Sequence, residues 1–190
     1  MIDNQTQYPK PLQEKRQAIA QDWIATHGLI ANAVRTASQE SDLTGSRPPC
    51  IRLNLESLRP FETIDSQFRP WGITLSNAIA LDPSNNAFPP RSGRIVLMGA
   101  PKNGWLEIIF HRPARFCNLY ITSSQRAILC AYGREGQVLD QDELRQSNLA
   151  QENASTTPNA CLQVYGPEIT RVTLYAFDGQ MTIDDPSYGF

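Results

Sequence analysis

The sequence predicts an antiparallel β-sandwich or barrel preceded by an N-terminal segment of different character. After about residue 50, short apolar or β-branched runs alternate with turn residues, and no helical pattern comes between them. In several of these runs apolar and polar residues alternate, which favours two stacked sheets with solvent on their outer faces. The 190 residues fit one domain of ordinary size with an appended segment.

The N-terminal segment is predicted to be a helical arm. Residues 12–25 are rich in helix formers, and Pro9 and Pro11 precede them where a helix start tolerates proline. Four apolar residues recur at spacings of four, seven and four, which aligns them on one stripe. We expect this stripe either to bind a protein partner or to pack on the chain's own sandwich. Its residues are Ile19, Trp23, Ile30 and Val34.

A linker is predicted to follow the arm. From Ser38 to Pro49 the composition shifts to Ser, Glu, Asp, Thr, Gly and Pro. We therefore expect residues 1–48 to form the arm and linker, and residues 49–190 to form the β-sandwich domain.

The second part contains eight or nine expected strands. The first alternates Ile51, Leu53 and Leu55 with polar residues, so one of its faces should be buried. Residues 140–160 are polar and are expected to form a long loop. The expected strands are 51–55, 72–75, 94–98, 105–110, 116–121, 127–132, 161–164, 169–177 and 181–183.

Four cysteines are widely spaced, without a Cys-x-x-Cys pair, and only two histidines accompany them. Zinc binding is therefore not expected, and the thiols should stay reduced. Runs 116–121 and 127–132 are expected to pair as a hairpin turning between Ser123 and Ser124, which places Cys117 opposite Cys130 on the core face.

Charge and hydropathy exclude several classes of function. The net charge of -2 and the pI near 5.7 leave no electrostatic footprint for nucleic acid or an anionic membrane. No stretch approaches a membrane span, and residues 1–7 are polar without the pattern of a secretory signal, so a cytoplasmic location is expected.

From Leu53 to Phe190 the order of short motifs resembles the jelly-roll domains of the galactose-binding-like superfamily, particularly those of exported bacterial proteins with PEP-CTERM sorting signals. The resemblance implies an antiparallel jelly-roll β-sandwich. The chain departs from that pattern in having Gly133 where an Asp is usual and in lacking an export signal and a sorting helix. The motifs are Leu55-Glu56-Ser57-Leu58, Gly72-Ile73-Thr74-Leu75, Pro90-Arg91-Ser92-Gly93, Phe110-His111-Arg112-Pro113, Tyr132-Gly133-Arg134-Glu135-Gly136 and Ile183-Asp184-Asp185-Pro186.

The same resemblance implies a structural calcium site. In calcium-containing sandwiches of this kind, a Glu of the first strand and an Asp of the last strand meet at one end, and the matching residues are Glu56 with Asp184 or Asp185. Calcium takes about six to eight oxygens, so carbonyls and the loop 81–86 would have to contribute. The alternative is that these are solvated turn carboxylates, with Asp185 restricted by Pro186.

No enzyme signature is present. His27 and His111 lack a neighbouring nucleophile motif, and adjacent Asp184 and Asp185 should point to opposite faces of a strand, which does not suit a glycosidase pair. Trp71 is the candidate sugar-stacking residue because Pro70 places it at a loop edge, with core or rim packing as the alternative.

These features favour a noncatalytic β-sandwich interaction module that binds a protein partner through its N-terminal helix, as a subunit or adaptor of a larger assembly. The alternative is a carbohydrate-binding module with a structural calcium site.

Overall fold

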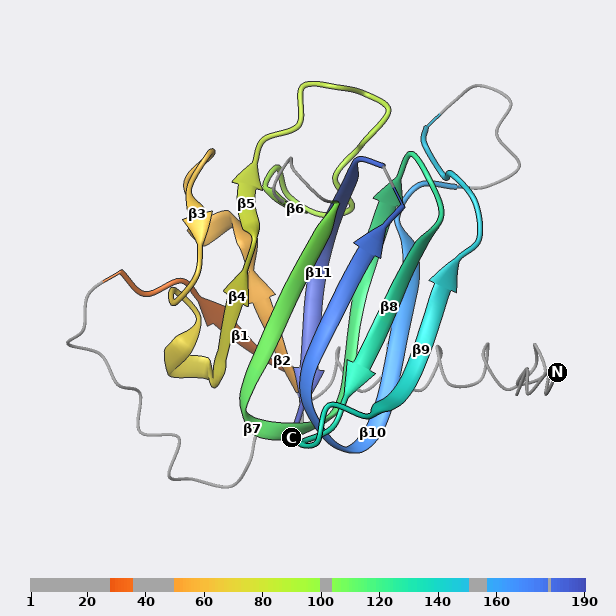
Figure 1. The fold of residues 1–190 in the computed structure, drawn as a ribbon. Helices are drawn as coiled ribbons and strands as arrows, with labels where there is room; N and C mark the ends of the chain where they lie inside the picture. Colours follow the sequence, from red (N-terminus) through yellow and green to blue (C-terminus); the bar gives the residue numbers. More distant parts are fainter. Residues whose placement is uncertain (1–27, 36–49, 100–103, 151–156, 178) are drawn as a thin grey trace, which may run out of the picture.

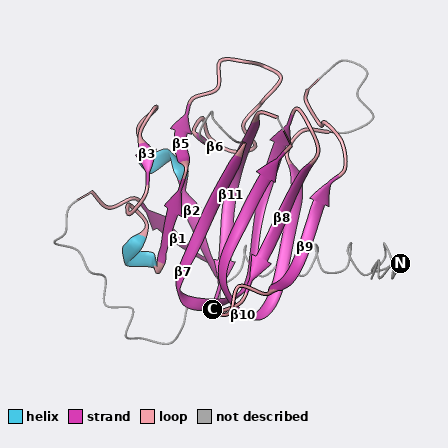
Figure 2. Ribbon diagram, in the orientation of Figure 1, coloured by secondary structure: helices cyan, strands magenta, loops and turns pink. Residues whose placement is uncertain are grey.

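The structure is a computed structural model, and it describes residues 28–35, 50–99, 104–150, 157–177 and 179–190. The described residues form eleven strands and two short 3-10 helices, and Figures 1 and 2 show their arrangement. None of the described residues belongs to a helix long and apolar enough to cross a membrane. The elements are β1 (Gly28–Asn32), β2 (Cys50–Asn54), η1 (Leu55–Ser57), β3 (Thr63–Ile64), η2 (Arg69–Trp71), β4 (Ile73–Ser76), β5 (Ala78–Leu81), β6 (Val96–Gly99), β7 (Trp105–Ser123), β8 (Ala127–Tyr132), β9 (Val138–Leu144), β10 (Ala160–Ala176) and β11 (Met181–Gly189).

Two long strands, β7 and β10, connect the two layers of a β-sandwich. The first half of β7 pairs with β4 and with the second half of β10, which continues to β8 and β9. The second half of β7 pairs with the first half of β10 and with β11, which continues to β6, β5 and β3 and also to β2 and β1. We call these the first and second layers. The predicted all-β sandwich is confirmed.

Each long strand bends where it passes from one layer to the other. Pro113 lies in β7 at this point, and Gly166 and Pro167 lie in β10, where the register shifts twice between Tyr165 and Arg171. Proline cannot donate to a ladder, and glycine and bulges allow a sharp bend, so these residues mark the corners. Figure 1 shows both corners at the same end of the sandwich, near the C-terminus.

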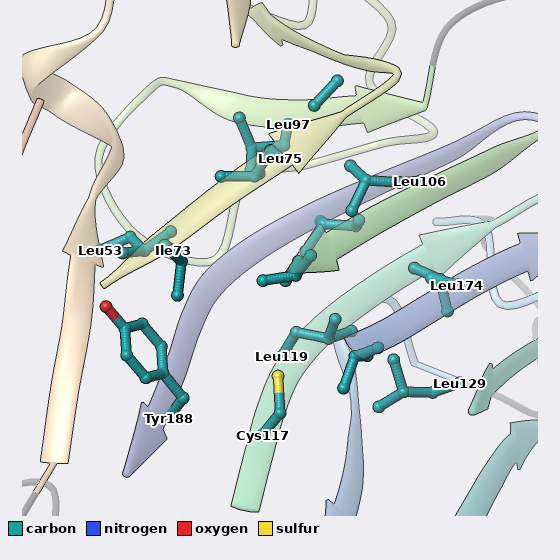
Figure 3. Close-up of a cluster of buried hydrophobic side chains, with 14 of the residues drawn as sticks. Leu53, Ile73, Leu75, Leu97, Leu106, Cys117, Leu119, Leu129, Leu174 and Tyr188 are labelled. Carbon is teal, nitrogen blue, oxygen red and sulfur yellow. The ribbon is translucent and has the colours of Figure 1, made fainter. Parts of the chain in front are cut away.

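The core lies between the layers and follows the alternation of the strands. Leu106 and Ile108 of β7 and Leu174 of β10 point inward from the first layer, and Leu119 and Ile121 point inward from the second. Figure 3 shows Leu129 and Leu174 across from Cys117 and Leu119. Burial of such side chains stabilises the fold by about 1.5–3 kcal/mol each.

Part of the predicted arm is not helical. Residues 28–32 form β1, which runs parallel to β2, and Ala31 is fully buried. Ile30 therefore lies in a strand, and Val34 follows it with its N–H donating to Gln67 O at 2.8 Å. The helix prediction is wrong for these two residues because pairing with β2 outweighs a sparse helical periodicity. Ile19 and Trp23 lie outside the described residues.

The predicted hairpin of 116–121 with 127–132 is wrong. After Ser123 the chain crosses from the second layer to the first, so β8 pairs with β10 and β9, and Cys130 lies opposite Thr173 and Gln141. Cys117 still faces the core, but from the other layer. None of the four cysteines, all of which the structure describes, forms a disulfide, and Cys50 and Cys117 are buried.

The first part of the polar segment 140–160 is a strand and not the predicted loop. Its first residues belong to β9, whose Asp140 and Asp142 accept hydrogen bonds from the backbone N–H groups of Tyr165 and Gln163, each at 2.9 Å. These carboxylates satisfy donors in the first half of β10, where, among the described strands, β7 alone pairs with it. The polar residues 140–144 therefore belong to an edge strand and not to a loop.

Candidate functional site

The outward side chains of the first layer form a regular grid on three neighbouring strands. Because strand residues alternate between the two faces, the residues that lie between the buried ones point away from the core. Cross-strand pairing aligns them in three rows, which we call the outer face. The rows are Trp105–Tyr175–Ile128, Glu107–Thr173–Cys130 and Ile109–Arg171–Tyr132.

An aromatic group occupies the first row and its extension. Tyr175 and Phe177 are 38% and 41% exposed, and their rings meet edge to face with centroids 4.8 Å apart. Trp105 pairs directly with Tyr175 across the strands and is half-buried. We call these three residues the aromatic row. More than a third of Tyr175 and of Phe177 is exposed, so part of each ring surface is available to a ligand.

Paired charges flank the aromatic row. Arg171 donates from Nη1 to Glu107 Oε1 at 3.3 Å, and its guanidinium lies 4.2 Å from the centroid of the Tyr132 ring. On the other side, Arg126 Nη2 lies 2.8 Å from Glu143 Oε2 and its guanidinium lies 5.2 Å from the Phe177 ring centroid. Each charged group is thus held in place and nearly neutralised by its partner.

The three predicted metal ligands converge on one loop, residues 91–95, but not on a common point. Asp184 Oδ2 accepts hydrogen bonds from the N–H groups of Arg91 at 2.7 Å and Ser92 at 3.0 Å. Glu56 Oε1 accepts from the N–H groups of Arg94 and Ile95, both at 2.7 Å. The two carboxylates therefore fix the loop from its two ends.

Asp185 holds the same loop through side chains. It accepts from Ser92 Oγ at 2.8 Å and forms ion pairs with Arg52 at 2.7 Å and Arg91 at 3.2 Å. Asp185 has a φ of 47°, at the irregularity that separates Asp184 from Ser187 in the β11 register. The expectation that the two Asp side chains point to opposite faces is therefore wrong, because this bulge turns both toward the loop.

The pKa directions follow from these contacts. Burial raises the pKa of the Asp184 carboxyl, and the hydrogen bonds from Ser92 and Arg91 oppose that rise. Hydrogen bonds from the N–H groups of Ile95 and Arg94 lower the pKa of Glu56.

Gly93, with a φ of 60°, lies against the Glu56 carboxylate, so any side chain there would collide with it.

This donor set does not fit a calcium ion. The oxygens that calcium would need already accept N–H groups, and two guanidinium groups place positive charge at Asp185. Among the described residues, no group of three or more His, Cys, Asp or Glu side chains could hold a metal ion. The contacts give Glu56, Asp184 and Asp185 the role of fastening a loop to β11 and η1.

Trp71 is half-buried, and contacts with β1 and β11 hold it in place. Its Nε1 donates to Asn32 O at 3.0 Å, and its carbonyl accepts from the Tyr188 hydroxyl at 2.8 Å. The ring packs against the core, so Trp71 is not an open stacking platform. Of the predicted histidines, His111 is exposed on β7 and His27 lies outside the described residues.

The aromatic row contains two residues that the sequence analysis did not single out, Tyr175 and Phe177. A signal was present: in the run 169–177 the outward positions carry Tyr and Phe where a solvent-facing strand usually carries polar residues.

No family model matches the chain, and no curated protein matches it. Among solved structures, a family 29 carbohydrate-binding module has a TM-score of 0.34 at 9% identity and covers 61% of this chain and 88% of its own. A mutant CBM29-2 complexed with mannohexaose has a TM-score of 0.36 at 10% identity, covering 61% of this chain and 91% of that one. A DUF4465 family protein from Bacteroides caccae has a TM-score of 0.42 at 8% identity, covering 83% of this chain and 98% of its own. These TM-scores are all low, so a proposal of function has to come from the surface of this chain.

Proposed function

We propose that this chain is a noncatalytic carbohydrate-binding module whose outer face binds a neutral glycan chain. The observation that carries the proposal is the aromatic row, in which Tyr175 and Phe177 are exposed beside ion-paired, hydrogen-bonding side chains.

The chemistry of the face suits sugar rings. An aromatic ring has a negative face, which attracts the weakly positive C–H groups on one side of a pyranose. The hydroxyls around the sugar need donors and acceptors beside that ring, and Arg171, Glu107, Arg126 and Glu143 supply both. Because strands and ion pairs hold these groups in place, little side-chain entropy is lost on binding.

The charges favour a neutral ligand. Glu107 and Glu143 would repel an anionic glycan, and Arg171 and Arg126 would repel a cationic one. Since each charge has its partner on the same face, neither sign dominates. A neutral chain meets no such opposition and can hydrogen-bond to both members of each pair.

The test is a neutral-glycan array with the whole chain, followed by calorimetry with the glycans that bind. Tyr175→Ala removes the ring at the centre of the aromatic row and should weaken binding about tenfold. Leu29→Ala is the control, since Leu29 is 44% exposed on β1, away from the outer face. Equal loss in both variants, or binding of the original chain to no glycan, would contradict the proposal.

The predicted protein partner of the N-terminal segment stays a separate prediction. Ile19 and Trp23 lie outside the described residues, so the geometry of the outer face neither requires nor opposes that contact. Removing residues 1–27 should leave glycan binding unchanged if the outer face carries it.

A further inference from the structure

A pocket lies beside the loop that follows β5. Its volume is about 240 Å³. It lies between that loop, β6 and the residues at the start of β11, and Phe61 is one of its lining residues. Figure 1 shows the tip of β5 and this loop at the end of the sandwich opposite the corners of β7 and β10. The lining residues used below are Phe61, Asp82, Asn85, Phe88, Gln180 and Met181.

Phe61 occupies a turn position that normally belongs to glycine or asparagine. Glu62 N donates to Arg59 O at 3.1 Å, which closes a four-residue turn with Pro60 second and Phe61 third. Phe61 has a φ of 65°, as the third position of a type II turn requires. A left-handed conformation is costly for a residue with a Cβ, and a bulky side chain makes it rarer still.

The fold gains little from this phenylalanine in return. Its side chain is 78% exposed, the highest value among the exposed large apolar residues in the described part of the chain. The backbone, in contrast, is anchored, because Phe61 N donates to Ala80 O at 2.7 Å. A strained residue that holds an uncovered ring over a pocket is best explained by contact with a ligand.

The rest of the pocket has an apolar floor and a polar rim. Phe88 and Met181 are 7% and 2% exposed and form the apolar part. On the rim, Asp82 forms an ion pair with Arg94 at 3.0 Å, and the amides of Asn85 and Gln180 line the opening. A compact ligand with an apolar face and several hydroxyl groups would match both parts.

We propose that this pocket binds a single neutral pyranose, at a site separate from the outer face. The ring of Phe61 stacks on the apolar side of the sugar, and the Asp82–Arg94 pair with the two amides hydrogen-bonds to its hydroxyls. The volume of about 240 Å³ lies just below the ~300–1,000 Å³ of pockets for drug-sized ligands, which suits one sugar ring. A single ring bound this way should have a dissociation constant on the order of 1 mM.

The test uses the whole chain, labelled with ¹⁵N, and a panel of neutral methyl pyranosides at millimolar concentrations. At least one glycoside should shift the amide resonances of residues 61, 82–88 and 180–182. Phe61→Asn removes the ring and places a residue that accepts a positive φ, so the melting temperature should rise by about 2 °C while affinity falls about fivefold. Phe61→Gly repeats the deletion without any side chain.

The controls separate this site from the outer face. Tyr175→Ala should leave methyl pyranoside binding at the pocket unchanged. This expectation holds whether or not the outer face binds a glycan. The proposal is overturned if no glycoside shifts the pocket resonances, or if Phe61→Asn lowers the melting temperature, which would show a structural ring. Shifts caused by N-acetylleucine amide and by none of the glycosides would also overturn it, because they would assign the pocket to an apolar side chain of a protein.

Discussion

Asn148 fastens the segment after β9 to the second layer, and loss of its side chain should lower the free energy of unfolding. Its Oδ1 accepts from Ser123 N at 2.7 Å, and its Nδ2 donates to Ile121 O at 2.8 Å. The side chain is 1% exposed, so water cannot replace it readily. Strand β10 begins opposite Ile121, and the amide of Asn148 continues that ladder by one step to Ser123.

The Asn148→Ala variant leaves these two buried backbone groups without their side-chain partner. Each unsatisfied group costs about 1–3 kcal/mol, so the free energy of unfolding should fall by about 4 kcal/mol. For a chain of this length, each kcal/mol corresponds to about 2–4 °C, and the melting temperature should fall by roughly 8–16 °C. Thermal unfolding followed by circular dichroism, with urea unfolding as a second measure, tests this.

The matched control is Asn86→Ala, which removes the same side chain from an exposed loop position and should change stability by less than about 0.5 kcal/mol. If the melting temperature of the Asn148→Ala variant falls by less than about 3 °C, the reasoning is refuted, because the segment 145–150 is then not held by this contact.

Three further predictions concern the carboxylates and thiols. The melting temperature should be the same in millimolar calcium and in chelator, since a bound ion would stabilise the native state. A higher melting temperature in calcium than in chelator would support the metal prediction for Glu56, Asp184 and Asp185. Arg35, together with the Arg59 N–H group and Gln67, lowers the pKa of Glu62 from 4.5 to about 2, so the Arg35–Glu62 pair stabilises the fold above pH 4.5 and progressively less as the pH falls toward 2. In Glu62→Gln the stability should therefore depend less on pH in that window, and an unchanged slope would count against the pair. Under native conditions a thiol reagent should modify the half-buried Cys130 and Cys161, whereas Cys50 and Cys117, whose pKa values burial raises to about 11 and about 12, should react only after unfolding; rapid modification of all four would contradict the burial.

Local patterns predicted the strands better than their partners. The runs 105–110 and 127–132 are strands with the buried faces that alternation indicates. Their partners could not be predicted, because the chain between Ser123 and Ala127 can either reverse within a sheet or cross to the other layer. The core side chains are buried in both arrangements, so hydrophobic alternation does not separate them.

The same limit applies to the sites. Glu56, Asp184 and Asp185 were expected to meet at one end of the domain as metal ligands, and in the structure they contact residues 91–95. Their partners are backbone N–H groups, which no side-chain pattern reveals. Likewise, Trp71 has the sequence context of an exposed ring, but its Nε1 bonds to Asn32, a contact across 39 residues.

The outer face as a glycan-binding surface is tested most directly by a ¹⁵N-labelled titration with a neutral glycan identified on the array. The account predicts that amide shifts concentrate on β7, β10 and β8, at residues 105–109, 171–177 and 128–132. Shifts confined to other surfaces, such as β1 or the loop 91–95, with these three strands unperturbed, would contradict it.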